Sequence, residues 1–202
     1  RIKPSLKGNV GLAHTRWATH GKPSVNNAHP HISKNSISVV HNGIIENYID
    51  LKNLQMKQGY VFTSETDTEV IAHAIESAIK SSNSLLKATQ KAIKTLNGSY
   101  GIGVLSSKYP DQIIAARKGS PLVIGIGENG NYVASDQMAL LSVTDKFIFL
   151  EEGDIAEIII DKITIYDFDG NLVNRPIKTS KLKIGQVDLG DYEHFMLKEI
   201  FE

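Results

Sequence analysis

Short β-rich segments follow one another from residue 99 to residue 167 of this 202-residue chain, with no long helical pattern between them. They read SYGIGVLSS, QIIAAR, LVIGIG, NYVAS, KFIFLEE, DIAEIII and KITIYD. Turn residues separate them, which predicts a meander of antiparallel strands, interrupted by a short helix at 136–141 that Ser135 or Asp136 caps. A parallel α/β fold would need strands and helices in regular alternation, so this order favours an α+β layered fold.

Two amphipathic helices precede the β-rich region. Apolar residues from Val70 to Ile79 recur at spacings that place them along one face of a helix beginning near Asp67. Thr66 and Glu69 have the spacing of a capping box at its start. A second helix is predicted over residues 85–96, and the two are expected to pack side by side.

Shorter elements are predicted in the first third of the chain. Residues 10–14 are expected to form a strand, and a long ordered loop follows through residue 36. A strand over 37–41 is expected to end in a tight turn at Asn42 and Gly43. A short helix around 51–56 would stop at Gly59, and residues 60–62 favour another strand.

Composition restricts the partners. The 22 basic side chains balance 22 acidic ones, so a nucleic-acid partner is disfavoured. No apolar run approaches the ~20 residues needed to cross a bilayer, and no signal-peptide pattern is present, so a soluble, cytoplasmic protein is expected. The chain contains no cysteine, which excludes a disulfide or thiolate within these residues. Because it begins with arginine, we expect a fragment of a longer protein.

The C-terminal part predicts a domain boundary. Apolar residues become sparse over 178–190, and a helical pattern resumes over 192–202. We therefore expect one domain over 1–190 and the start of a linker helix over 191–202 that leads toward a further domain.

Three polar stretches are candidates for a common site: HTRWATHG at 14–21, HNG at 41–43 and SETDTE at 64–69. Arg16 can be a surface ion-pair partner, or its planar guanidinium can hold a carboxylate through two parallel hydrogen bonds. Asn42 and Gly43 can form a hairpin turn or donate hydrogen bonds to a developing oxyanion. Asp67 can complement the helix dipole or bind an ammonium group.

A metal site and a phosphate-binding loop are also considered. His29 and His31, with His14, His20 or His41, are numerous enough for zinc, but their spacing matches no known ligand pattern, so no metal or other cofactor is expected. The glycines of GIGENG at 125–130 indicate a hairpin, because no helical pattern follows them directly.

Further motifs occur in the same order as in a known family: NAHPH at 27–31, HNGIIEN at 41–47, SETDTEV at 64–70, SPL at 120–122, ASD at 134–136 and FLEEGDIAEI at 149–158. Together with HTRWATHG they resemble the glutaminase domains of glucosamine-6-phosphate synthases, which are class II glutamine amidotransferases. The resemblance runs over nearly the whole chain and implies a four-layer αββα sandwich of antiparallel sheets, of the N-terminal-nucleophile hydrolase type.

The resemblance also implies roles for individual residues. Arg16 would hold the α-carboxylate of glutamine with the Thr19 hydroxyl and the His20 backbone, Asp67 would pair with its α-ammonium group, and Trp17 would shape the loop. Asn42 and Gly43 would form the oxyanion hole, and His29 would lie behind the substrate-contacting residues.

The same family uses an N-terminal cysteine as its nucleophile. The resemblance therefore implies a segment upstream of Arg1, and the 202 residues alone are expected to be inactive. The intact protein would hydrolyse glutamine and pass ammonia to C-terminal isomerase domains that convert fructose 6-phosphate to glucosamine 6-phosphate, and it would be a homo-oligomer. The alternative is a non-catalytic glutamine-binding or regulatory module.

Overall fold

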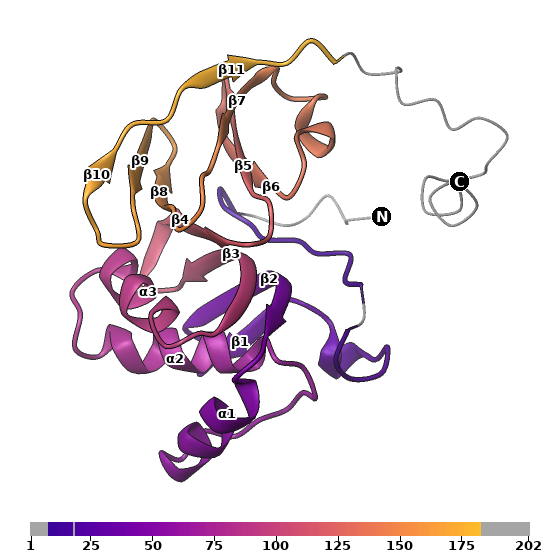
Figure 1. Cartoon of the computed structure of the whole chain (residues 1–202), viewed down its shortest axis with the longest axis vertical. Coiled ribbons are helices and arrows are strands. Elements are labelled where there is room, and N and C mark those ends of the chain that lie inside the picture. Colours follow the sequence, from indigo (N-terminus) through magenta and orange to yellow (C-terminus); the bar gives the residue numbers. More distant parts are fainter. Residues whose placement is uncertain (1–7, 18, 183–202) are drawn as a thin grey trace, which may run out of the picture.

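The chain folds into two antiparallel sheets with helices packed on one side (Figure 1). The computed structural model describes residues 8–17 and 19–182. The larger sheet has seven strands in the order β1-β2-β3-β4-β8-β9-β10. Their bounds are β1 His31–Ser33, β2 Ile37–Ile45, β3 Gly98–Ser106, β4 Tyr109–Lys118, β8 Ile155–Ile159, β9 Lys162–Tyr166 and β10 Leu172–Val173.

The smaller sheet has four strands in the order β11-β7-β5-β6. Their bounds are β5 Val123–Gly127, β6 Gly130–Ala134, β7 Lys146–Phe149 and β11 Ile177–Thr179. All the strand pairs in both sheets are antiparallel. The β-rich segments are therefore strands as predicted, but they divide between two sheets instead of forming one meander. This division follows from tertiary pairing, since β4 pairs with β8 across the intervening β5–β7 segment.

Three α-helices cover the face of the larger sheet that is turned away from the smaller sheet: α1 Tyr48–Lys57, α2 Glu69–Ile79 and α3 Leu85–Ile93. In Figure 1 they lie together in the lower half of the molecule, away from β5, β6 and β7. Fully buried Ile71 and Ile75 of α2 pack with Ile37, Tyr100 and other strand residues in one core. Apolar residues recur with the 3.6-residue period of a helix in α2, and the buried residues of the strands recur at every second position. Each element therefore has one apolar face, and these faces pack together.

A second core lies between the two sheets. Adjacent residues of β4 serve different cores, because Ile114 faces the helices and Ala115 faces the smaller sheet. A short helix η2, Gln137–Leu140, packs Leu140 against Phe147 on the outer face of the smaller sheet. The Asp136 carboxylate caps it by accepting a hydrogen bond from the Met138 amide at 2.7 Å, as predicted. The α+β sandwich of antiparallel sheets is confirmed. The described residues form one layer of helices and two layers of sheet.

Gly103 of β3 lets the N-terminal segment approach the sheet. Gly103 lies on the face opposite the helices, and a methyl group there would come within 3.1 Å of the Leu12 side chain. Residues 10–14 therefore run over this face, with half-buried and exposed side chains alternating. They do not form the predicted strand, because no ladder partner lies beside them among the described residues.

The predicted turn at Asn42 and Gly43 is also wrong. β2 continues through both residues, which pair with Gly101 and Tyr100 of β3. The tight turn lies earlier, over residues 34–36, where the Ser36 amide donates to the Ser33 carbonyl oxygen at 2.9 Å and Lys34 and Asn35 have φ angles of 47° and 53°. That turn joins β1 to β2, and β1 lies within the segment predicted to be a loop.

Two further local predictions fail. Residues 60–62 do not form a strand, and Tyr60 instead turns inward and donates a hydrogen bond to the Glu76 carboxylate of α2. The capping box is absent, since the Thr66 hydroxyl bonds to the His31 ring. The Glu69 carboxylate accepts from the amides of residues 63 and 64. In each case a tertiary partner replaces the local one.

Other local predictions are confirmed. Helix α1 ends before Gly59, whose φ of 86° suits a helix stop, and GIGENG forms the β5–β6 hairpin. The 3-10 helix η1, Val25–Asn27, lies in the predicted long loop. Within the described residues no helix is long and apolar enough to span a membrane. The predicted linker helix and the boundary at 190 lie outside the described residues.

Candidate active site

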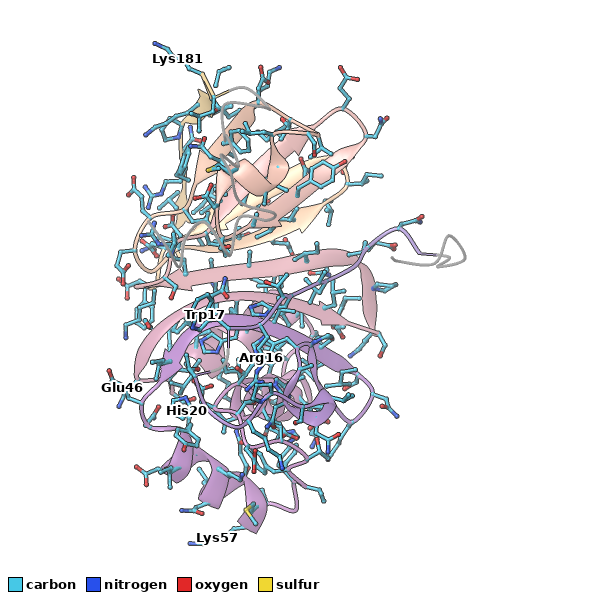
Figure 2. The ribbon with its side chains drawn as sticks, turned by 90° about the vertical axis from the view of Figure 1, so that its right-hand side faces the viewer. Arg16, Trp17, His20, Glu46, Lys57 and Lys181 are labelled. Atoms are coloured by element: carbon cyan, nitrogen blue, oxygen red, sulfur yellow. The ribbon has the colours of Figure 1, made fainter. Side chains whose placement is uncertain are left out.

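One pocket of about 110 Å³ brings together the residues from the three polar stretches. It is lined by all eight predicted site residues: Arg16, Trp17, Thr19, His20, His29, Asn42, Gly43 and Asp67. In Figure 2 the labelled side chains of Arg16, Trp17 and His20 lie in the middle of the molecule. Lys181 lies at its upper end and Lys57 at its lower end. Four more lining residues belong to the same three stretches but were given no individual role in glutamine binding from the sequence: His14, His41, Thr66 and Thr68.

Arg16 closes its own loop. Its φ of 50° lies in the left-handed region, and its guanidinium folds back to donate to the carbonyl oxygens of His20 at 2.8 Å and Gly21 at 3.0 Å. The same guanidinium reaches the Lys22 carbonyl at 3.3 Å. Within the described part of the chain it makes no ion pair with a carboxylate. Its charge therefore remains available to an anionic ligand in the pocket.

Asp67 provides the opposite charge. Its side chain is only 4% exposed, and Oδ2 accepts a hydrogen bond from the Ile45 amide at 2.7 Å. The other oxygen, Oδ1, lies 4.0 Å from His20 Nδ1, which is buried without a hydrogen-bond partner. The bond to Ile45 joins the segment just before α2 to the end of β2. The carboxylate is thus held rigidly, with one oxygen left for a cationic ligand.

Asn42 and Gly43 lie side by side in β2 instead of in a turn. The Asn42 carboxamide oxygen bonds to His14 Nε2 at 2.8 Å. Gly43 has a φ of 131°, and a Cβ there would clash with the Ser99 carbonyl oxygen of β3. Only glycine permits this close approach of the two strands, so the backbone at Gly43 is fixed by the sheet.

Two neutral histidines that line the pocket, His29 and His41, bond to each other and to neighbouring groups. His29 Nδ1 accepts from the His41 amide at 3.2 Å, and the Thr68 hydroxyl bridges the two rings at 3.4 Å and 2.9 Å. His41 Nε2 then lies 3.3 Å from the Ser99 carbonyl oxygen. Burial and the neighbouring His14 lower the pKa of His29 to about 3, and burial lowers the pKa of His41. These rings therefore position other groups in their neutral form.

The outer residues of the pocket are more open. The Trp17 side chain is 72% exposed, and Thr19 is exposed as well. His31 lies deeper, where its Nε2 is 3.0 Å from the Thr66 hydroxyl.

The described residues contain no group of three or more His, Cys, Asp or Glu side chains arranged to hold a metal ion. The named nitrogens of His14, His29, His31 and His41 make hydrogen bonds within the protein, whereas His20 Nδ1 has no partner among the described residues.

Comparison with known proteins identifies the family. A model described as a glutamine amidotransferase domain matches residues 14–142, which is more than half of the chain. The chain belongs to this family. The matched region includes every predicted site residue, and the resemblance based on sequence motifs is therefore confirmed at the level of the family.

Curated relatives of this amidotransferase domain are much longer. The chain is 56% identical over 197 residues to glutamine–fructose-6-phosphate aminotransferase [isomerizing] of Haemophilus influenzae, covering 98% of the chain and 32% of that protein. It is 52% identical, with the same coverage, to the enzyme of that name from Acinetobacter baylyi. The chain thus spans about a third of the length of these relatives.

Solved structures support the amidotransferase fold. Glutamine phosphoribosylpyrophosphate amidotransferase from B. subtilis, complexed with ADP and GMP, matches with a TM-score of 0.65 and 25% identity over 79% of this chain and 35% of that one. A structure described as the allosteric regulatory enzyme of purine biosynthesis matches with a TM-score of 0.66 and 27% identity over 77% and 34%. The sequence is thus much more similar to the fructose-6-phosphate enzymes than to these structural neighbours.

Proposed function

We propose that this domain binds glutamine in the 110 Å³ pocket and, in a longer protein, catalyses its hydrolysis to glutamate and ammonia. The observation that carries the proposal is the meeting of Arg16, Asp67 and the Asn42–Gly43 pair around one cavity. A positive group, a negative group and an oxyanion-binding pair match the α-carboxylate, the α-ammonium and the side-chain amide of glutamine.

Each end of glutamine has a proposed partner. The Arg16 guanidinium binds the α-carboxylate, with the Thr19 hydroxyl and the His20 backbone beside it. Asp67 Oδ1 receives the α-ammonium group, since Oδ2 is already bonded to the Ile45 amide. Trp17 forms the outer wall, and His29, which also lines the pocket, holds the His41 backbone in place. The side-chain amide then points toward Asn42 and Gly43.

The proposed chemistry is acyl transfer. A thiolate attacks the γ-amide carbon, and the negative charge that develops on the carbonyl oxygen accepts hydrogen bonds from Asn42 Nδ2 and the Gly43 amide. As this intermediate collapses, the proton that the thiol lost on forming the thiolate passes to the amide nitrogen, so ammonia leaves and a γ-glutamyl thioester remains, which water hydrolyses to glutamate and free thiol. None of the 202 residues is a cysteine, so this reaction requires a thiol from outside them.

The names of the relatives extend the proposal to the whole protein. We propose that the ammonia passes to C-terminal isomerase domains of the same full-length chain, which convert fructose 6-phosphate to glucosamine 6-phosphate. The high identity to the glutamine–fructose-6-phosphate aminotransferases supports this choice. A homo-oligomeric state and a cytoplasmic location belong to the same proposal, and sizing chromatography and cell fractionation test them.

The decisive experiment uses the complete reading frame that encodes this chain. Replacement of Asn42 by alanine should lower kcat for glutamine hydrolysis by roughly 10² to 10³, the usual effect of losing one oxyanion donor. Asn53→Ala is the matched control, because Asn53 lies on the exposed side of α1, away from the pocket. A full kcat in the Asn42 variant would refute the oxyanion assignment.

Glutamine binding separates the enzyme from a binding module. Calorimetric titration should show that the complete protein binds glutamine and that Arg16→Lys weakens the binding. If the complete protein binds glutamine but releases no ammonia under any condition that keeps its thiols reduced, the non-catalytic module is the correct function. If it does not bind glutamine, both functions are wrong.

A further inference from the structure

His14 lies between two groups of the pocket that serve different parts of the proposed reaction. Its Nδ1 is 2.8 Å from the backbone nitrogen of Arg16, and its Nε2 is 2.8 Å from the side-chain oxygen of Asn42. One ring therefore connects the loop that would hold the α-carboxylate to the amide that would stabilise the oxyanion.

The first contact fixes the tautomer of the ring. A backbone N–H can only donate, so His14 Nδ1 must be the unprotonated nitrogen that accepts from Arg16. In a neutral imidazole the proton then resides on Nε2. His14 Nε2–H is consequently a donor directed at Asn42.

The second contact fixes the orientation of the Asn42 carboxamide. A donor at Nε2 requires an acceptor opposite it, so the side-chain oxygen of Asn42 faces His14 and the NH₂ group faces away. Among the described residues, Asn42 Nδ2 has no hydrogen-bond acceptor. The amide is thus held by its oxygen, and its donor hydrogens remain free for a ligand.

We propose that His14 is a positioning residue that selects the catalytically useful orientation of the Asn42 amide and couples it to the Arg16 loop. This inference rests on the proposed glutaminase function. Without His14, the Asn42 amide can rotate by 180° and present its oxygen to the developing oxyanion, which is repulsive. With His14 in place, the donor is already oriented before the transition state forms.

The surroundings of His14 limit other orientations of its ring. The ring packs against His29, with centroids 4.3 Å apart and planes tilted by 31°. His29 is itself held by the His41 amide and stays neutral, since burial lowers its pKa to about 3. The His14 ring is therefore packed against the His29 ring on one side and hydrogen-bonded at both of its nitrogens.

Two substitutions separate the two bonds. Glutamine at position 14 places an amide NH₂ near the former Nε2 and keeps a donor for Asn42, but it lacks the acceptor at the Nδ1 position. Asparagine places its amide near the former Nδ1 and keeps an acceptor for the Arg16 amide, but it cannot reach Asn42. The two variants therefore remove one bond each.

The test measures steady-state glutamine hydrolysis by the complete protein. His14→Asn should lower kcat at least tenfold with KM within about threefold of wild type. His14→Gln should keep kcat within about threefold and raise KM roughly tenfold, as expected for the loss of one hydrogen bond that orders the binding loop. If both variants lower kcat equally, or if neither changes it, the inference is overturned.

A double variant distinguishes positioning from a general structural role. In an Asn42→Ala background there is no amide left to orient, so adding His14→Asn should leave kcat within about twofold of Asn42→Ala alone. A further fall as large as that in the wild-type background would overturn the inference. Thermal melting of each variant checks folding, and His14→Gln alone decides the matter if His14→Asn does not fold.

The proposed function and this inference fail in different ways. Full activity in Asn42→Ala would refute the oxyanion role itself. A severe loss in Asn42→Ala, combined with wild-type kinetics in His14→Asn, would leave the glutaminase proposal intact and overturn only the role of His14.

Discussion

Replacement of Glu69 by glutamine should destabilise the protein at neutral pH and have progressively less effect as the pH falls. Glu69 is 2% exposed at the first residue of α2. Burial by itself would raise the pKa of its carboxyl, but His73, the Ser64 hydroxyl and the amides of Thr63 and Ser64 outweigh burial and hold the pKa at about 2. His73 Nε2 is 3.7 Å away, too far for a hydrogen bond, so we assign most of this effect to Ser64 and Thr63 at 2.6 to 3.1 Å.

The magnitude follows from the difference between the folded and unfolded states. The pKa of the carboxyl has its ordinary value of 4.5 in the unfolded chain and is lowered to about 2 in the folded one. At about 1.4 kcal/mol per pKa unit, the ionised form contributes about 3 kcal/mol of stability above pH 4.5. Because the folded pKa is lowered, this contribution decreases as the pH falls, to about half at pH 3, and it is lost as the pH passes below about 2.

Urea unfolding followed by far-ultraviolet circular dichroism at pH 7, 5, 4 and 3 tests this reasoning. The difference in unfolding free energy between wild type and Glu69→Gln should be about 3 kcal/mol at pH 7 and should decrease steadily toward pH 3. Glu46→Gln is the control, because Glu46 is exposed at the end of β2 and its change should stay within about 0.5 kcal/mol. A difference that is the same at pH 7 and pH 3 would refute the ionic origin of the effect.

Four other variants give separate predictions. Arg16→Lys should raise KM for glutamine at least about tenfold in steady-state assays, since lysine lacks the planar fork, and an unchanged KM would contradict the carboxylate role. Gly43→Ala should cost more than about 2 kcal/mol in thermal melting because its Cβ would clash with the β3 backbone, and an unaltered melting temperature would be inconsistent with that contact. Arg175→Ala should cost about 3 kcal/mol in urea unfolding, because it removes the two-bond ion pair at 2.8 Å from the buried Asp154 carboxylate; a wild-type midpoint would rule this out. His29→Asn should flatten the stability profile between pH 6.5 and 3, since wild-type His29 stays neutral in the fold while the unfolded chain takes up a proton, and parallel profiles would argue against this.

Local patterns in the sequence were sufficient for the elements that are built from neighbouring residues. The apolar spacing from Val70 to Ile79 predicted helix α2, and Gly59 predicted the end of α1. The β-rich segments from residue 99 to residue 167 predicted the strands β3 to β9. Each of these patterns reports a period or a backbone preference that a few adjacent residues decide.

Where the local predictions from the sequence were wrong, pairing between strands that are distant in the sequence was the cause. Asn42 and Gly43 have the composition of a tight turn, yet they lie within β2 because nine residue pairs with β3 extend the strand through them. Residues 10–14 have strand-like composition, yet they have no ladder partner among the described residues. A dipeptide preference is worth much less than a continuous ladder of backbone hydrogen bonds, so tertiary pairing decides such positions.

The sequence by itself determined the family and the chemical groups of the candidate site, because residues such as Arg16, Asn42 and Asp67 occur in motifs with a fixed order. The tertiary structure alone decided how these groups meet and which neighbours orient them. His14 shows the difference most clearly. From the sequence it was a possible zinc ligand at the start of the HTRWATHG stretch, whereas in the fold its two ring nitrogens link Arg16 to Asn42, which lies 28 positions from His14 along the chain. Hydrogen bonds depend on distance and direction in space, and the spacing of residues along the chain determines neither.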